Sequence, residues 1–223
     1  MSLEYVIGVD LGQAHDYTAV AVLERELRET GRKLKRYAYG GGHELVPELE
    51  AIYRVRHLER FPLGTAYPLQ VERVKELTHA TQRLRLRDGE RAKVRLVVDQ
   101  TGVGRPVVDM LNRAGLRNLT PVTIHGGDQT VREGTSYRVP KRELVSVLQV
   151  LLQTRRLEVA AALELALMLQ REMLAFKVEI TKSGHDTYGN DWRENEHDDL
   201  VLAVALAAWA GERVPRLGML RYG

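Results

Sequence analysis

Acidic residues stand at three places in the sequence where their carboxylates could act together. Asp10 ends the apolar run EYVIGVD, and Asp99 ends a second run, KVRLVVD. Asp198 and Asp199 follow His197 and open a long apolar stretch. Three or four carboxylates within a few ångströms cannot all stay ionised unless a cation neutralises them. These residues therefore point to hard divalent cations, and two such ions can activate water and stabilise the leaving oxygen of a phosphodiester.

Each acid also has an ordinary structural explanation when it is considered alone. Asp10 precedes Leu-Gly and Asp99 precedes Gln-Thr-Gly, so either could accept hydrogen bonds in a turn. Asp198 could be the N-cap of a helix, with Asp199 favoured near the positive helix end. A histidine at the position of His197 is usually a capping or surface residue. The joint pattern of two acid-ended strands and a double-acid helix start favours the metal site.

The apolar pattern predicts the elements that would carry these acids. Strands are predicted over 4–10, 17–26, 51–61, 93–99 and 119–124, the first two forming a hairpin. Helices are predicted over 69–86, 107–115, 139–157, 161–174 and from 198, with a β-hairpin over 176–190. This order predicts an α/β fold, a mixed sheet with helices on both faces. If the strands ending at Asp10 and Asp99 are parallel neighbours, both acids face one cleft.

The composition limits the class of protein and the class of site. The chain has 223 residues, 44% of them hydrophobic and 28% charged, as in an ordinary soluble globular protein. No repeat or linker divides it, so we expect a single domain over 1–223, with 212–223 as a tail. No apolar stretch approaches the roughly 18 residues that span a bilayer, so no membrane partner is expected. Because cysteine is absent, ligands must be carboxylate or imidazole, which favours Mg²⁺ or Mn²⁺.

Basic residues cluster in the sequence although the net charge is only +3. The densest stretch is RLRLRDGERAKVR, residues 83–95. Arginine suits bidentate contacts with phosphate, but such a stretch can equally be a solvated helix face and loop. Both interpretations remain open on charge alone.

Four segments together resemble a known family. They are VDLGQAHDYTAVAVL, VVDQTGVG, SYRVPKRELVSVLQVLL and EHDDLVLAVALA, in this order between residues 5 and 211. The set resembles the nuclease domain of phage large terminase subunits, a branch of the ribonuclease H-like fold. The His-Asp-Asp start after a Gly-turned hairpin is its most specific piece, Asp-x-Thr-Gly-x-Gly is moderately specific, and Asp-x-Gly alone would be weak.

The resemblance implies a set of functional residues. Asp10 and Asp99 would be ligands of two Mg²⁺ or Mn²⁺ ions, and Asp198 or Asp199 would supply a third carboxylate. Relatives often carry another acid where this chain has Leu202, which puts a fourth catalytic carboxylate in doubt unless Asp198 fills that role. Residues that could support the site or contact DNA are His197, Asp16, Lys182, His185, Arg193 and Arg105.

The resemblance also implies a biological setting. The expected function is cleavage of concatemeric viral DNA with little sequence specificity, in the cytoplasm of an infected cell. Expected partners are double-stranded DNA, an ATPase domain, the portal and the small terminase subunit. Full-length large terminases carry a P-loop ATPase, but GxxxxGK[ST] does not occur here. We therefore expect an isolated nuclease domain.

Three alternatives stay open. A Holliday-junction-resolvase-like nuclease shares the acid pattern on the same fold. A non-catalytic domain could bind DNA or a portal protein without using metals. A fragment of an actin/hexokinase-like ATPase could use DLG and TGVG as phosphate loops, although that fold usually needs two such domains.

Overall fold

The computed structural model describes residues 3–12, 16–37, 41–86, 89–102, 105–116, 118–182 and 198–213, with the backbone alone for 176–182. Its strands are β1 Leu3–Asp10, β2 Ala19–Tyr37, β3 His43–Arg60, β4 Lys93–Asp99, β5 Leu119–His125, β6 Val131–Glu133, β7 Ser136–Pro140 and β8 Leu157–Val159. Its helices are α1 Tyr67–Gln82, α2 Arg105–Arg113, α3 Lys141–Gln153, α4 Ala166–Lys182 and α5 Asp199–Glu212.

The described strands form one mixed sheet of eight, in the order β6-β7-β5-β4-β1-β2-β3-β8. The predicted first hairpin is confirmed, because β1 pairs antiparallel with β2. On its other side β1 pairs in parallel with β4, which is followed by β5 and β7 in parallel. The strands that end at Asp10 and Asp99 are therefore the parallel neighbours that a shared cleft requires.

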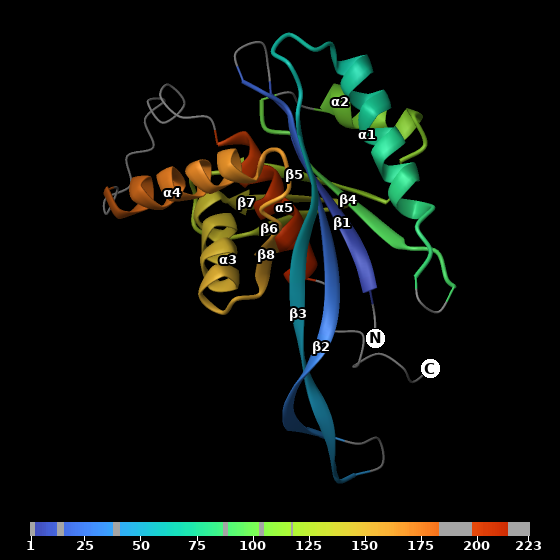
Figure 1. The fold of residues 1–223 in the computed structure, drawn as a ribbon, viewed down its shortest axis with the longest axis vertical. Helices are drawn as coiled ribbons and strands as arrows, with labels where there is room; N and C mark the ends of the chain where they lie inside the picture. The colour runs from blue at the N-terminus through green and yellow to red at the C-terminus, as the bar shows by residue number, and fades with distance from the viewer. Residues whose placement is uncertain are drawn as a thin grey trace.

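Helices cover both faces of the sheet, as the sequence pattern predicts (Figure 1). Successive strand residues point to opposite faces, so β1 is buried on both sides. Val6 belongs to a core with α3 and α5, whereas Ile7 and Val9 belong to a core with α1 and α2. The three side chains have no exposed surface, which explains why the strand reads as a nearly continuous apolar run.

Helix α5 is the central helix of the fold. Residues 199–211 are all buried, which accounts for an apolar sequence with no polar face. It packs directly on β1 at Gly8, where an added Cβ would lie 2.0 Å from the carbonyl oxygen of Ala203. Only glycine allows this contact between strand and helix backbones. The contact fixes the start of α5 beside the sheet edge where β1 ends.

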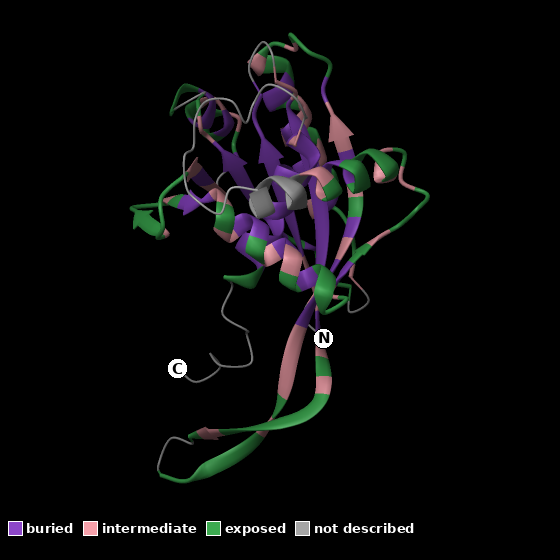
Figure 2. Ribbon diagram, turned by 90° about the vertical axis from the view of Figure 1, so that its left-hand side faces the viewer, coloured by how far each residue is buried: buried purple, intermediate pink, exposed green. Residues whose placement is uncertain are grey.

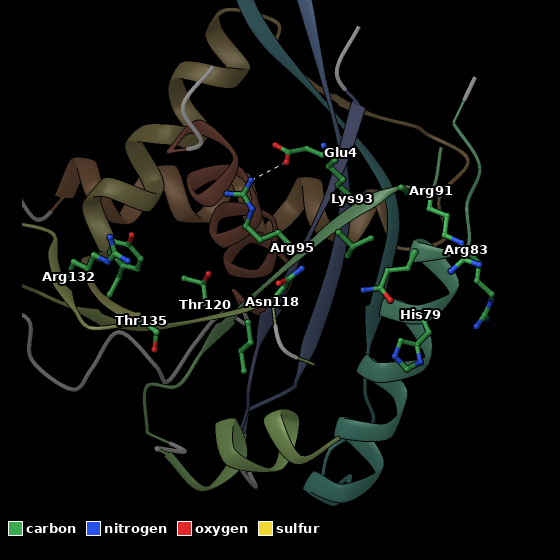
Figure 3. A pocket seen from close by; sticks show the side chains of 15 residues that line it. Glu4, His79, Arg83, Arg91, Lys93, Arg95, Asn118, Thr120, Arg132 and Thr135 are labelled. Carbon is green, nitrogen blue, oxygen red and sulfur yellow. Dashed lines mark hydrogen bonds and ion pairs between the residues drawn. The ribbon is translucent and has the colours of Figure 1, made fainter. Parts of the chain in front are cut away.

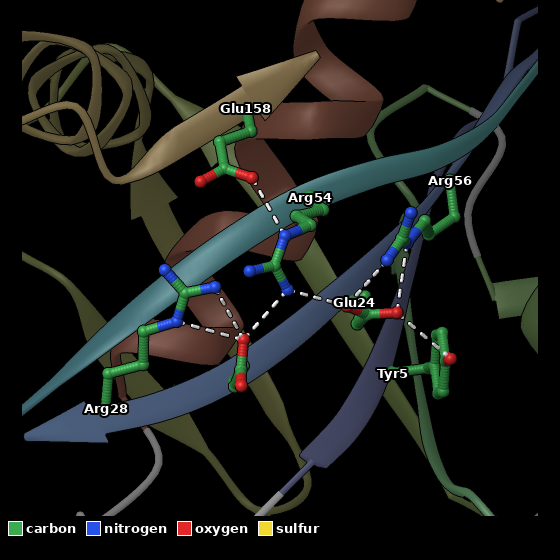
Figure 4. A network of polar contacts seen from close by, with 7 residues as sticks. Tyr5, Glu24, Arg28, Arg54, Arg56 and Glu158 are labelled. Carbon is green, nitrogen blue, oxygen red and sulfur yellow. Dashed lines mark hydrogen bonds and ion pairs between the residues drawn. The ribbon is translucent and has the colours of Figure 1, made fainter. Parts of the chain in front are cut away.

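Strands β2 and β3 extend beyond the sheet as a two-stranded arm, residues 28–37 and 43–49 (Figures 1 and 2). Its base is held by Glu24, which is 7% exposed (Figure 4). This carboxylate accepts hydrogen bonds from Arg54 Nη1 at 2.8 Å, Arg56 Nη2 at 2.9 Å and the Tyr5 hydroxyl at 3.2 Å. Burial alone would raise the pKa of Glu24, but the bonds from Arg56 and Arg54 outweigh it and lower the pKa. Ion pairs thus anchor the base of the arm, beside buried apolar residues such as Leu27 and Ala51.

One predicted element is wrong in part. The β-hairpin predicted over 176–190 does not begin at 176, because α4 continues as a helix to Lys182. The β-branched residues there favour a strand, but extending an existing helix costs little once its first turns have formed. The rest of that predicted hairpin, 183–190, lies outside the described residues. None of the described helices is both long and apolar enough to cross a membrane.

Candidate active site

Asp10 and Asp99 end neighbouring parallel strands at the same edge of the sheet. The register pairs Val9 with Val98, so each acid is the next residue along its strand. Both side chains are buried, with 9% and 6% of their surface exposed. Asp99 Oδ1 accepts hydrogen bonds from the backbone N–H of Thr101 at 2.8 Å and from its hydroxyl at 2.5 Å. The turn role considered for Asp99 is thus real, and it also fixes the direction of the carboxylate.

Asp198 and Asp199 stand at the start of α5. Asp198 occupies the N-cap position, but within the described residues its side chain makes no capping hydrogen bond. Its Oδ2 instead pairs with Lys141 Nζ at 2.7 Å. Asp199 is buried, and its Oδ2 lies 3.2 Å from Arg60 Nη2. The sequence could place both acids at a helix start, but neither cation partner was predicted.

Arg60 and Glu172 complete the site and were missed from the sequence. Arg60 ends β3 and forms ion pairs with both Glu172 and Asp199, while its guanidinium lies 4.7 Å from the centroid of the Tyr17 ring. Glu172 is on α4 and is 6% exposed. Its Oε2 accepts the backbone N–H of Val201 at 3.0 Å, so a neighbouring helix satisfies an amide at the start of α5. The sequence offered no sign of this role, because Glu172 lies among other polar residues of α4.

The carboxylates influence one another electrostatically. Burial raises the pKa of Asp10 well above its ordinary value, and the charges of Asp99, Asp198 and Asp199 raise it further against the opposing effect of Lys141. All four acids and one lysine therefore share a single electrostatic site. Its excess negative charge favours binding of protons or cations.

Two of the buried acids have a pKa near neutrality. Burial raises the pKa of Asp199 to about 7, with Arg60 opposing the rise and Asp198 and Asp16 adding to it. Burial also raises the pKa of Glu172 to about 7, although the Val201 N–H and Arg60 oppose it. The charge of Asp199 also raises the pKa of Glu172, so the two acids influence each other as well as Arg60.

The residue types fit a hard divalent cation, since the converging ligands are all carboxylate oxygens. Within the part of the chain that the structure describes, however, no three His, Asp or Glu side chains form a ready ligand set for one ion. Lys141 and Arg60 instead balance the charges of Asp198 and Asp199. A divalent ion would have to compete with these two protein cations for the same carboxylates.

Gly12, which follows β1, is held by a hydrogen bond to Thr18, which precedes β2. Gly12 N–H donates to the Thr18 hydroxyl at 3.0 Å, and that hydroxyl donates to Gln70 Oε1 at 3.0 Å. An added Cβ on Gly12 would lie 2.2 Å from the carbonyl oxygen of Asp16, so the turn requires glycine there. This turn brings Asp16 close enough to influence the pKa of Asp199.

The other predicted residues lie on the helices around the site or outside the described residues. Arg105 is exposed at the start of α2, the helix that follows β4. Lys182 is the last residue of α4, and its side chain is not described. Leu202 is buried in α5 and belongs to the apolar core. His185, Arg193 and His197 lie outside the described residues.

Comparison with known proteins shows which fold this is. No family model matches the chain, and no curated protein matches it either. Among solved structures, the large terminase nuclease from thermophilic phage G20c is 21% identical, with a TM-score of 0.51 over 92% of this chain and 81% of that one. The chain has the fold of a terminase nuclease. The predicted ribonuclease H-like α/β fold is thereby confirmed.

A second solved structure has a lower score. The human cytomegalovirus terminase nuclease domain, in an Mn-soaked crystal, is 15% identical, with a TM-score of 0.45 over 95% of this chain and 85% of that one.

Proposed function

We propose that this chain is a nuclease that hydrolyses DNA phosphodiesters in a viral DNA-packaging terminase. The observation that carries the proposal is the convergence of Asp10, Asp99, Asp198 and Asp199, from β1, β4 and α5, at one edge of a terminase-nuclease fold. Their joint effect on the pKa of Asp10 supports a site that needs positive charge to function.

The acids would hold two divalent ions, Mg²⁺ or Mn²⁺. Asp10, Asp99 and either Asp198 or Asp199 would hold these ions through their carboxylate oxygens. When bound, such ions lower the pKa of an attacking water and stabilise charge on the leaving oxygen. The carboxylate set is the chain's contribution to that chemistry.

The surrounding residues would keep these carboxylates in position. Thr101 orients Asp99 through two hydrogen bonds to one oxygen. Glu172 and Arg60 hold the start of α5 through the Val201 amide and Asp199. A site held by packed elements and by hydrogen bonds around its ligands keeps its geometry through a reaction.

Lys141 would have a different role, as a cation inside the acidic site. In the absence of metal it partly compensates the acids through Asp198, 2.7 Å away. Its first-turn position on α3 keeps it at the site whether or not Asp198 binds an ion. Such an ammonium can also bind a phosphate oxygen of the DNA strand.

The proposed substrate is double-stranded concatemeric viral DNA, cut with little sequence preference. Contacts to the phosphate backbone position DNA without reading its sequence. Arg105, Lys182, His185 and Arg193 are proposed as such contacts, and His197 as a support for the site. In this setting the partners would be an ATPase domain, the portal and the small terminase subunit, in the host cytoplasm.

The decisive experiment is nicking of supercoiled plasmid by the purified chain in Mn²⁺ or Mg²⁺. Wild-type protein should nick the plasmid, and Asp10→Asn should lose about 100-fold or more of that activity while remaining folded. Asp109→Asn is the matched control, since this acid is exposed on α2. Full activity of Asp10→Asn would refute the assignment.

A non-catalytic DNA-binding domain is the second candidate, favoured by the way Lys141 and Arg60 already balance the acids. The hypothesis of a non-catalytic domain is supported if the wild type leaves plasmid intact in both metals while binding DNA with a steep salt dependence. Cleavage of four-way junctions in strong preference to linear duplex would instead indicate a resolvase.

A further inference from the structure

A hollow of about 860 Å³ opens at the sheet edge opposite the carboxylates (Figure 3). It is lined by the first residues of β1, β4 and β5, the end of α1 and part of the β6–β7 hairpin. Lys93 begins β4 and Asp99 ends it. At about 3.3 Å per residue, the hollow is about 20 Å from the acidic site. It is therefore a separate feature of the molecule.

Cations surround this hollow. Arg83, Arg91, Lys93, Arg95 and Arg132 line it, and the first four lie on the densest basic stretch of the sequence (Figure 3). Among the described residues, no carboxylate lies within ion-pair distance of Arg83, Arg91 or Lys93. Arg83, Arg91 and Lys93 are exposed, so they place positive charge at the surface of the hollow.

The carboxylate that lines the hollow is already neutralised. Glu4 Oε1 pairs with Arg25 Nη1 at 2.9 Å, and Glu4 Oε2 pairs with Arg95 Nη2 at 3.1 Å. By contrast, Arg54 and Arg56 at the base of the arm are each paired with an acid. The positive potential of the hollow is accordingly not cancelled by its own lining.

The lining favours phosphate over an acidic protein segment. Protein interfaces take most of their affinity from large apolar or aromatic anchors buried in pockets. Here the apolar residues Ala92 and Val94 are almost fully buried, and the Tyr137 ring packs edge-on against Trp209 with centroids 5.4 Å apart. Neutral donors such as Asn118 also line the hollow, of the kind that contact phosphate and sugar.

We infer that this hollow binds the phosphate backbone of DNA, apart from the catalytic edge. The inference rests on the proposed function only for the identity of the polyanion. Backbone contacts neutralise phosphates and release counterions, so they give affinity without sequence preference. The hollow would hold DNA on the protein without taking part in its hydrolysis.

The test measures binding of a fluorescein-labelled 30-base-pair duplex by anisotropy in EDTA, over a series of salt concentrations. The variant Arg83→Gln/Arg91→Gln/Lys93→Gln should bind at least tenfold more weakly near 0.1 M salt, and its log–log salt slope should fall by about three. The matched control is Lys33→Gln/Arg113→Gln/Arg155→Gln, which removes three exposed charges elsewhere and should leave the slope nearly unchanged. Thermal melting checks that both variants fold.

Three results would overturn the inference. The first is that the Arg83→Gln/Arg91→Gln/Lys93→Gln variant keeps the wild-type salt slope. The second is that both variants lose the same amount of salt slope, which would mean that only net charge matters. Alternatively, labelled poly-glutamate can bind the wild type and not the hollow variant while duplex binding is unchanged, which would indicate an acidic protein partner.

Plasmid nicking by the same preparations separates this inference from the proposed function. If the wild type nicks DNA but the hollow variant keeps its salt slope, the inference fails and the nuclease stands. If no preparation nicks DNA but the slope falls as expected, the nuclease fails and the DNA site stands.

Discussion

Replacing Glu172 by alanine should destabilise the protein strongly, although the residue lies outside every sequence motif. The change removes the acid partner of Arg60 and leaves the Val201 N–H without its acceptor at the buried start of α5. Removing one member of a buried ion pair costs about 3–5 kcal/mol, and a buried unsatisfied amide costs about 1–3 kcal/mol. The two losses overlap and Asp199 still contacts Arg60, so we expect about 3 kcal/mol.

Urea unfolding of metal-free protein measures this loss, provided that the m-value is unchanged. Glu172→Gln keeps an acceptor oxygen for the Val201 amide and should lose only about 1–2 kcal/mol. Glu72→Ala is the control, because that acid is 58% exposed in its pair with Lys75, and its removal should cost less than about 1 kcal/mol. A loss below about 1 kcal/mol for Glu172→Ala would refute the idea that this acid holds the start of α5.

Three further predictions follow from the same geometry. Gly8→Ala should cost about 3 kcal/mol or more in urea unfolding, since its Cβ would meet the Ala203 carbonyl oxygen at 2.0 Å; a smaller loss would mean that α5 can shift. Asp10→Asn should raise the metal-free melting temperature, because it relieves repulsion among the acids; a lower value would contradict the pKa rise. Metal-free stability should fall as pH rises from 5 to 8. In the folded state the pKa of Asp199 and of Glu172 is about 7, above the ordinary value of each acid. Between pH 5 and 8 the folded protein therefore binds more protons than the unfolded chain, so raising the pH favours unfolding. A urea midpoint that rises with pH would be inconsistent with this.

The sheet and its acid-bearing ends were predictable because they depend on local pattern. Continuous apolar runs ended by Asp10 and Asp99 predict two buried strands. Their parallel pairing was only a condition that the sequence left open, and the structure shows it. The sequence also placed Asp198 and Asp199 correctly at a helix start. The positions of these strands and of the helix start follow from local pattern, whereas the pairing of β1 with β4 joins residues far apart in the sequence.

The partners of those acids depend on tertiary contacts, which the sequence pattern does not encode. Arg60 reaches Glu172 across 112 positions and Lys141 reaches Asp198 across 57. Such pairings depend on which helix covers which face of the sheet. The helical continuation of α4 to Lys182 was missed for a related reason, since propensity over a short segment is a weak guide beside an existing helix.

The structure distinguishes the two adjacent acids that the sequence could not separate. Asp199 has a side chain 7% exposed and contacts Arg60, which Glu172 in turn holds, so it is built into the frame of α5. Asp198 has a side chain 24% exposed and pairs with Lys141, whose flexible ammonium can move away at little cost. A cation arriving at Asp10 would therefore displace Lys141 from Asp198 more easily than it would displace Arg60 from Asp199. We infer that Asp198 is the more available metal ligand, with Asp199 fixing the helix start that carries it.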